Sequence, residues 1–195
     1  MKKYIAEALG TFGLALVVAL SLVGKFPVPT PVLAALTLGL FVYSVGHISG
    51  THINPAVTLG LWSIKKINTQ HAMGYIVAQF IGAGLAMALL TSTVGMPTLE
   101  VSNSLMVGVA EALGTFFFTF GIASVVYGKA PSILSGMVVG GSLLLGITIA
   151  ALLGSNGVLN PAVALGIGSF GSMYVLGPII GSVLGMQLYK YLQIN

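Results

Sequence analysis

The chain has 195 residues, of which 56% are apolar and only 5% are charged. Ordinary soluble domains carry about 25% charged residues, so this composition excludes a protein whose whole surface faces water. The net charge of +4 comes from scattered lysines, with no arginine and no cysteine, which argues against a nucleic acid partner and excludes disulfides, thiolate metal sites and cysteine nucleophiles.

Six segments are predicted to cross a membrane, for which about 20 mostly apolar residues are needed. The first resembles a signal peptide, with two lysines before an apolar run and a weak cleavage site at Ala19-Leu20-Ser21. Glu7 inside that run, and the reappearance of the segment later, argue for a retained helix. The predicted spans are 4–23, 32–47, 71–90, 105–126, 133–152 and 172–192.

Two shorter apolar pieces, 54–62 and 160–168, each begin at an Asn-Pro-Ala triplet. At 1.5 Å per residue each would be about 13.5 Å long, too short for a hydrocarbon core of about 30 Å. End to end the two would nearly span it. They are therefore predicted to be re-entrant half-helices.

Lysine placement predicts the orientation. With the N-terminus inside, one lysine, Lys25, falls outside together with Glu100, which is a positive-inside pattern. We therefore expect a multi-pass protein of the cell membrane with both termini cytoplasmic. The lysines expected on the cytoplasmic side are Lys2, Lys3, Lys65, Lys66, Lys129 and Lys190.

The two halves of the chain repeat each other. AEALGTF occurs at 6–12 and again at 110–116, an offset of 104, and Asn-Pro-Ala-Val at 54–57 recurs at 160–163, an offset of 106. Because each half has three spans, the second copy must be inverted relative to the first. The chain thus divides into repeats 1–98 and 99–195 within one membrane domain. Small residues at four-residue spacing indicate close helix packing; they are Gly74, Ala78, Gly82 and Ala86 in one repeat and Gly177, Gly181 and Gly185 in the other.

Each Asn-Pro-Ala triplet has the chemistry of a helix start facing a polar passage. Asn is a preferred N-cap and Pro suits the first helical position. Each start contributes about +0.5 charge from the helix dipole, and each Asn amide can donate to a passing oxygen. Such a pore favours neutral, oxygen-bearing molecules and repels cations. The predicted pore centre comprises Asn54, Pro55, Ala56, Asn160, Pro161 and Ala162.

The chain resembles the major intrinsic protein family, the aquaporins and glycerol facilitators. The matching stretches are AEALGTF in both repeats, SVGHISGTHINPAVTLG, YIVAQFIGAG, LNPAVALG and YVLGPIIG, and together they cover the whole chain. The resemblance implies an all-α membrane protein, an inverted repeat of six transmembrane helices plus two re-entrant half-helices. It also implies a homotetramer in a lipid bilayer with one pore per subunit, passing water and small neutral solutes. No cofactor or metal is expected.

The resemblance also implies a selectivity filter of four positions, here Ala34, Ile147, Gly157 and Val163, with Thr148 as an alternative to Ile147. Water-selective members resemble one another in an aromatic at the first position, His at the second and Arg at the fourth. The ring in this sequence is apolar and lacks arginine. Two outcomes are open: a wide filter that passes glycerol, urea, ammonia or hydrogen peroxide, or an apolar ring that dewets and closes.

Backbone carbonyls of the two loops before the half-helices are expected to line the pore. They belong to Gly50, Thr51, His52 and Ile53, and to Asn156, Gly157, Val158 and Leu159. By family resemblance His52 lines the cytoplasmic half; a pH gate there is the alternative.

Glu7 and Glu111 lie at equivalent places within spans, where ionisable groups are rare and functional. Either they hold the loops by accepting backbone N–H groups, or they form a proton-coupled pair. The sequence favours a passive channel; the alternatives are a structural or adhesive membrane protein with a closed pore and a proton-coupled transporter. An enzyme is not expected, because the chain has no acid–base constellation near a nucleophile.

Overall fold

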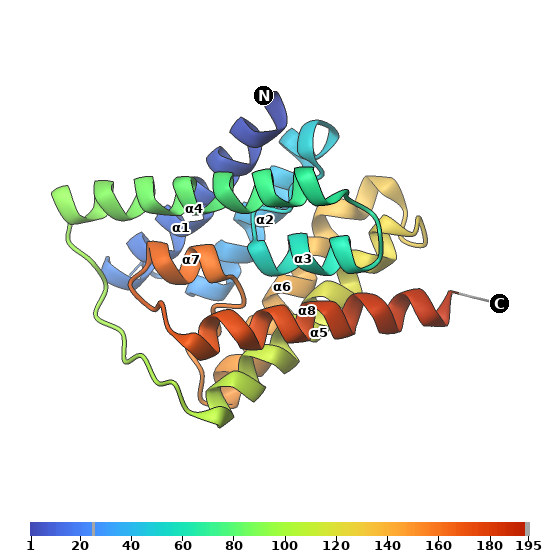
Figure 1. Ribbon diagram of the computed structural model, residues 1–195. Helices are drawn as coiled ribbons and strands as arrows, with labels where there is room; N and C mark the ends of the chain where they lie inside the picture. The colour runs from blue at the N-terminus through green and yellow to red at the C-terminus, as the bar shows by residue number, and fades with distance from the viewer. Residues whose placement is uncertain (25, 194–195) are drawn as a thin grey trace.

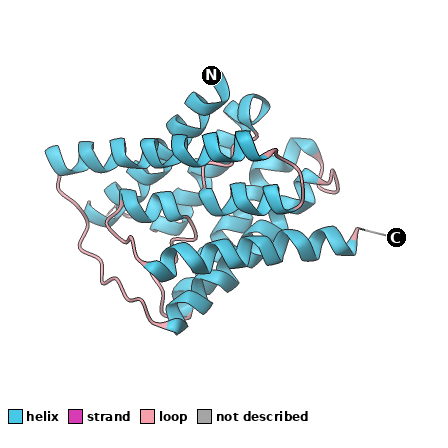
Figure 2. Cartoon of the chain, viewed as in Figure 1, coloured by secondary structure: helices cyan, strands magenta, loops and turns pink. Residues whose placement is uncertain are grey.

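The computed structural model describes residues 1–24 and 26–193, and the regular structure of these residues is entirely helical (Figure 2). Six helices are long and apolar enough to cross a membrane, which confirms the expected fold class. They are α1 (Lys2–Val23), α2 (Thr30–Ser49), α4 (Thr69–Ser92), α5 (Leu105–Val126), α6 (Ser135–Leu152, after the 3-10 turn η1, Ser132–Leu134) and α8 (Ser172–Leu192).

The two short helices lie between the long ones and contact each other (Figure 1). Helix α3 (Pro55–Ser63) has nine residues, close to the predicted 54–62. Helix α7 (Pro161–Gly166) has six, so it is shorter than the predicted 160–168. Gly168 ends it with a φ of 76°, a conformation that suits glycine at a helix terminus. The half-helix pair is therefore asymmetric in length.

The long helices pack in corresponding pairs, α1 on α4 and α5 on α8. The small-residue rows form these contacts. A Cβ added at Gly82 on α4 would lie 2.1 Å from the carbonyl oxygen of Ala8, and one at Gly181 on α8 would lie 2.0 Å from that of Ala112. Glycine thus allows one backbone to rest directly on another at equivalent places in both halves.

We expect Gly82→Ala to lower the free energy of unfolding by about 1–3 kcal/mol, because the added methyl group has no space against the α1 backbone. Gly84→Ala on the same helix is the matched control, since nothing lies within 4 Å of its added Cβ. Thermal unfolding of both variants in detergent measures the difference. Equal midpoints would contradict the close α1–α4 contact.

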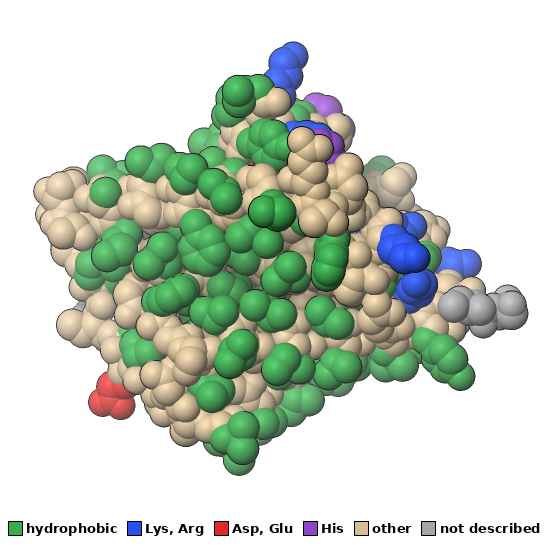
Figure 3. All heavy atoms as spheres, in the orientation of Figure 1, with side chains coloured by type: hydrophobic (Ala, Val, Ile, Leu, Met, Phe, Trp, Pro, Cys, Tyr) green, Lys and Arg blue, Asp and Glu red, His purple; other side chains and the backbone are tan. Residues whose placement is uncertain are grey.

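On the face of the molecule drawn in Figure 3, charged side chains lie at the ends. Figure 3 shows basic side chains at the top and right, an acidic one at the lower left, and a broad apolar surface between them. Glu7 and Glu111 are fully buried, whereas Glu100 is exposed. Lys25, expected opposite the other lysines, lies outside the described residues. An apolar belt between charged ends is the surface that a lipid bilayer requires.

Candidate functional site

The two half-helices begin at the Asn-Pro-Ala triplets, and each Asn caps its own helix. Asn54 Oδ1 accepts a hydrogen bond from the N–H of Ala56 at 2.8 Å. Asn160 Oδ1 accepts from the N–H groups of Ala162 and Val163 at 3.1 and 3.2 Å. Capping by the side-chain oxygen directs each amide nitrogen away from its own helix.

Those amide nitrogens join the two halves. Asn54 Nδ2 donates to the carbonyl of Leu159, and Asn160 Nδ2 donates to the carbonyl of Ile53, both at 2.9 Å. An amide NH2 has two donors. Each Asn therefore has a second N–H beyond this cross-link, and both side chains line the same cavity.

The loops before the half-helices hold an unusual backbone conformation. Thr51, Ile53 and Leu159 have φ angles of 51°, 38° and 56°, in the left-handed region that bulky L-residues rarely adopt. Such a conformation persists only where surrounding contacts fix it.

In the first half those contacts come from Glu7 of α1. One carboxylate oxygen accepts from Ser49 Oγ at 2.7 Å and the His52 N–H at 2.9 Å. The other accepts from the Ile53 N–H at 2.6 Å and Gln79 Nε2 at 2.8 Å. Four donors thus converge on one fully buried carboxylate, two on each of its oxygens.

In the second half Glu111 of α5 makes the equivalent contacts. It accepts from the Ser155 hydroxyl, from the Val158 N–H at 2.9 Å and from the Leu159 N–H at 2.7 Å. Among the described residues that line the cavities, neither Glu7 nor Glu111 occurs. The two carboxylates therefore face the loop backbones of their own halves, not a lumen.

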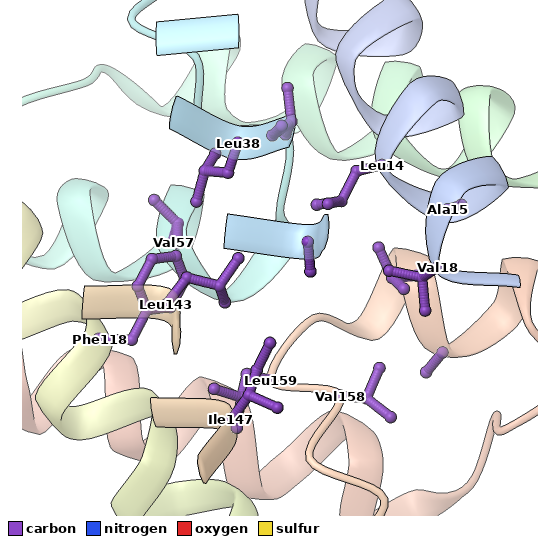
Figure 4. Close-up of a cluster of buried hydrophobic side chains, with 14 of the residues drawn as sticks. Leu14, Ala15, Val18, Leu38, Val57, Phe118, Leu143, Ile147, Val158 and Leu159 are labelled. Carbon is purple, nitrogen blue, oxygen red and sulfur yellow. The ribbon is translucent and has the colours of Figure 1, made fainter. Parts of the chain in front are cut away.

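A cavity of about 330 Å³ lies on one side of the two Asn side chains. Its walls are apolar side chains, several of which converge from α1, α2, α5 and α6 in Figure 4. The wall residues shown there are Leu14, Val18, Leu38, Phe118, Leu143, Ile147 and Val158.

All four predicted filter positions, Ala34, Ile147, Gly157 and Val163, line this cavity. Of the two alternatives at the second position, the cavity contains Ile147. Thr148 is exposed and donates to the Leu144 carbonyl at 2.8 Å, because it lies on another face of α6.

Gly157 has a φ of 64°, and a Cβ there would lie 3.0 Å from the Ile147 carbonyl oxygen. The backbone conformation and the close Ile147 carbonyl therefore favour glycine at this position. The ring is apolar on every side chain that contributes to it.

A second cavity, of about 210 Å³, lies beyond His52 and is lined by Gly50, Thr51 and Val57 among others. His52 lines both cavities, so they lie next to each other at this residue. The imidazole is held in place, with Nδ1 3.1 Å from Thr58 Oγ1. The two cavities thus share one wall residue, and the two Asn amides line the larger of them.

The predicted pore residues do not all line these two cavities. Asn54, Asn160, His52, Ile53, Asn156 and Val158 line the first cavity, and Gly50 and Thr51 line the second. Pro55, Ala56, Pro161, Ala162 and Leu159 line neither cavity. The Leu159 carbonyl accepts from Asn54 and its side chain is fully buried, so its place in the expected carbonyl ladder stays a prediction.

Sequence reasoning missed the residues that position the loops. Ser49 and Ser155 each lie five residues before the motif Asn and donate to the carboxylate of their own half. That repeated spacing was a usable signal. Gln79, which donates to both Glu7 and Thr58, has no such repeat.

Six membrane-length helices around two opposed half-helices, with cavities beside them, define a channel-type membrane protein. Comparison with known proteins agrees. The sequence profile described as Major intrinsic protein matches residues 1–189. The probable aquaporin AqpM of Archaeoglobus fulgidus is 38% identical over 184 residues, covering 81% of this chain and 73% of the relative. Aquaporin NIP1-1 of Zea mays is 33% identical, covering 99% of this chain and 75% of the relative.

The fold is similar to the X-ray structure of the aquaglyceroporin from Plasmodium falciparum, with a TM-score of 0.70 at 21% identity, covering 99% of this chain and 96% of that one. The chain belongs to the major intrinsic protein family. It is accordingly an integral membrane channel of the aquaporin type for water or small solutes, and not an enzyme.

Proposed function

We propose that the chain forms a passive pore for water and for neutral solutes of the size of glycerol and urea. The observation that carries this proposal is the pair of Asn amides, Asn54 and Asn160, beside a cavity whose filter ring has no polar side chain. Two donors at the centre favour an oxygen-bearing solute. The α3 dipole adds positive potential there, and the shorter α7 adds less.

The filter supports solutes larger than water. Ala34 and Gly157 leave space where water-selective relatives are expected to carry larger groups, and Val163 stands where they are expected to carry Arg. A cavity of about 330 Å³ is of the size that holds small organic molecules. Closure by dewetting is the alternative outcome for the same ring.

The surroundings of Glu7 and Glu111 support a passive pore over a proton-coupled transporter. Coupling would need a carboxylate that faces the lumen and changes its protonation state. Both carboxylates are instead buried against loop N–H groups. We further propose that both termini of this cell-membrane protein lie in the cytoplasm, as the lysine placement indicates. The equivalent contacts in the two halves support a division near residue 98 into two inverted repeats. We also propose that the apolar outer surfaces of four subunits pack together as a homotetramer.

Solute flux into proteoliposomes tests the proposal. We expect osmotic water flux, glycerol uptake and urea uptake all to exceed those of protein-free vesicles, without any dependence on a proton gradient. Water flux alone would refute the wide filter. Absence of water, glycerol and urea flux would indicate a closed or non-conducting protein. Uptake driven by an imposed pH gradient would support a proton-coupled transporter instead.

A further inference from the structure

The cytoplasmic cavity carries a charge that the filter lacks. Its walls are mostly aliphatic, including Val42, Ile122 and Val139, but Lys66 also lines it. Among the described residues that line either cavity, Lys66 is the only lysine or carboxylate. The two cavities together therefore have one charged side chain of these types, in the cavity that does not contain the filter positions.

The backbone fixes Lys66 at the rim of this cavity. Helix α3 ends at Ser63, and the chain then reverses through Lys65, whose φ is 63°. The Lys66 N–H donates to the Leu61 carbonyl at 2.9 Å, which closes the turn. Leu61 itself lines the cavity, so the turn places Lys66 beside it.

The Lys66 ammonium reaches across to the other half of the chain. Its Nζ lies 4.4 Å from the centroid of the Tyr127 ring, directly after α5. This is within the range of a cation–π contact. Val125 and Val126, the residues before Tyr127, line the same cavity. The ammonium is thus held near the cavity mouth by groups from both halves.

We propose that Lys66 is a charge-selectivity residue of this pore: together with the positive half-helix starts, and without a filter arginine, it excludes small cations at the cytoplasmic mouth. The proposal rests on the function proposed above. Lys66 is exposed at the rim, and the aliphatic cavity walls beside it screen its charge less than water does, so the ammonium repels a cation that enters the cavity. A neutral solute meets no such barrier.

A plainer role for Lys66 is to interact with the negative C-terminal end of the α3 dipole. That role would affect stability and leave ion selectivity unchanged. The two roles therefore separate in a flux experiment in which each cation is paired with a neutral solute of similar size, guanidinium with urea and potassium with water.

The chain has no cysteine, so Lys66→Cys introduces a single thiol whose charge can be set chemically. In proteoliposomes we expect this variant to take up cations about tenfold faster than wild type, equivalent to about 1.4 kcal/mol, with urea and water flux unchanged. A trimethylammonium-ethyl methanethiosulfonate should restore exclusion, and the sulfonate analogue should not. Lys66→Arg should remain cation-tight. Lys65→Cys is the matched control, since Lys65 lines the surface pocket beside Trp62 but not the cavity, whereas Lys66 borders both.

Cation uptake by Lys66→Cys at the wild-type rate, with neutral flux intact, would overturn the inference and leave the channel standing. So would reagents of opposite charge having the same effect, which would indicate a steric role. A wild type that passes neither neutral solute would remove the proposed function and this inference with it. Lys66→Gln provides the same comparison if the cysteine variant is not recovered folded.

Discussion

Glu7→Gln should leave little folded protein in the membrane. The two carboxylate oxygens of Glu7 accept from Ser49, His52, Ile53 and Gln79. A glutamine amide replaces one carboxylate oxygen by an NH2 group. In either orientation of the amide, this NH2 group faces two of the four donors that Glu7 accepts from. Removing one side of such a buried charge-assisted network costs about 3–5 kcal/mol.

That cost is a large part of a typical stability of about 5–15 kcal/mol. The first loop also has Thr51 and Ile53 at positive φ, so it has a strained conformation that Glu7 helps to hold. We expect loss of monodisperse protein in detergent, and loss of solute flux from whatever is recovered.

Glu100→Gln is the matched control, because Glu100 is exposed and only its backbone carbonyl is used, by Asn156 Nδ2. Its midpoint of thermal unfolding should stay close to that of wild type. A fully folded and conducting Glu7→Gln protein would show that the loop conformation does not depend on the carboxylate. Glu111→Gln should behave in the same direction, with fewer donors left unpaired.

The sequence predicted the helices well, because the apolar runs and the Asn-Pro starts are local signals. The spans of α5 and α8 are confirmed to the residue or nearly so, and α3 begins directly after Asn54. The end of α7 was harder to predict from the sequence. Gly166 and Gly168 are both compatible with a helix end. In the structure α7 ends at Gly166, and the chain turns at Gly168, which has a positive φ.

The site could be predicted in part. The repeated motif identified Asn54 and Asn160, and resemblance supplied the filter positions. The partners of Glu7 could not be derived, because a carboxylate within an apolar run is compatible both with proton coupling and with loop support. Only the converging N–H groups distinguish the two arrangements. From the sequence, Lys66 indicates only membrane orientation. Its position at a cavity rim depends on the turn after α3, which the sequence does not predict.

Val163→Arg should narrow the range of permeant solutes. Val163 lines the larger cavity and is 3% exposed, so a side chain that extends from this position enters the space of the filter. An Arg there would add five N–H donors and a fixed positive charge to a ring that has neither. We expect glycerol and urea uptake to fall about tenfold or more, while water flux is largely kept.

Size and charge can be separated by a neutral control. Val163→Met also lengthens the side chain but adds no donor, so it should reduce glycerol uptake through volume alone and leave a ring that holds no ordered water. The Arg variant can bond passing water and should therefore conduct it better than the Met variant. Equal water flux in the two would mean that volume alone governs this filter. Unchanged glycerol uptake in Val163→Arg would place the constriction elsewhere, and His52, which lines both cavities, would be the next position to substitute.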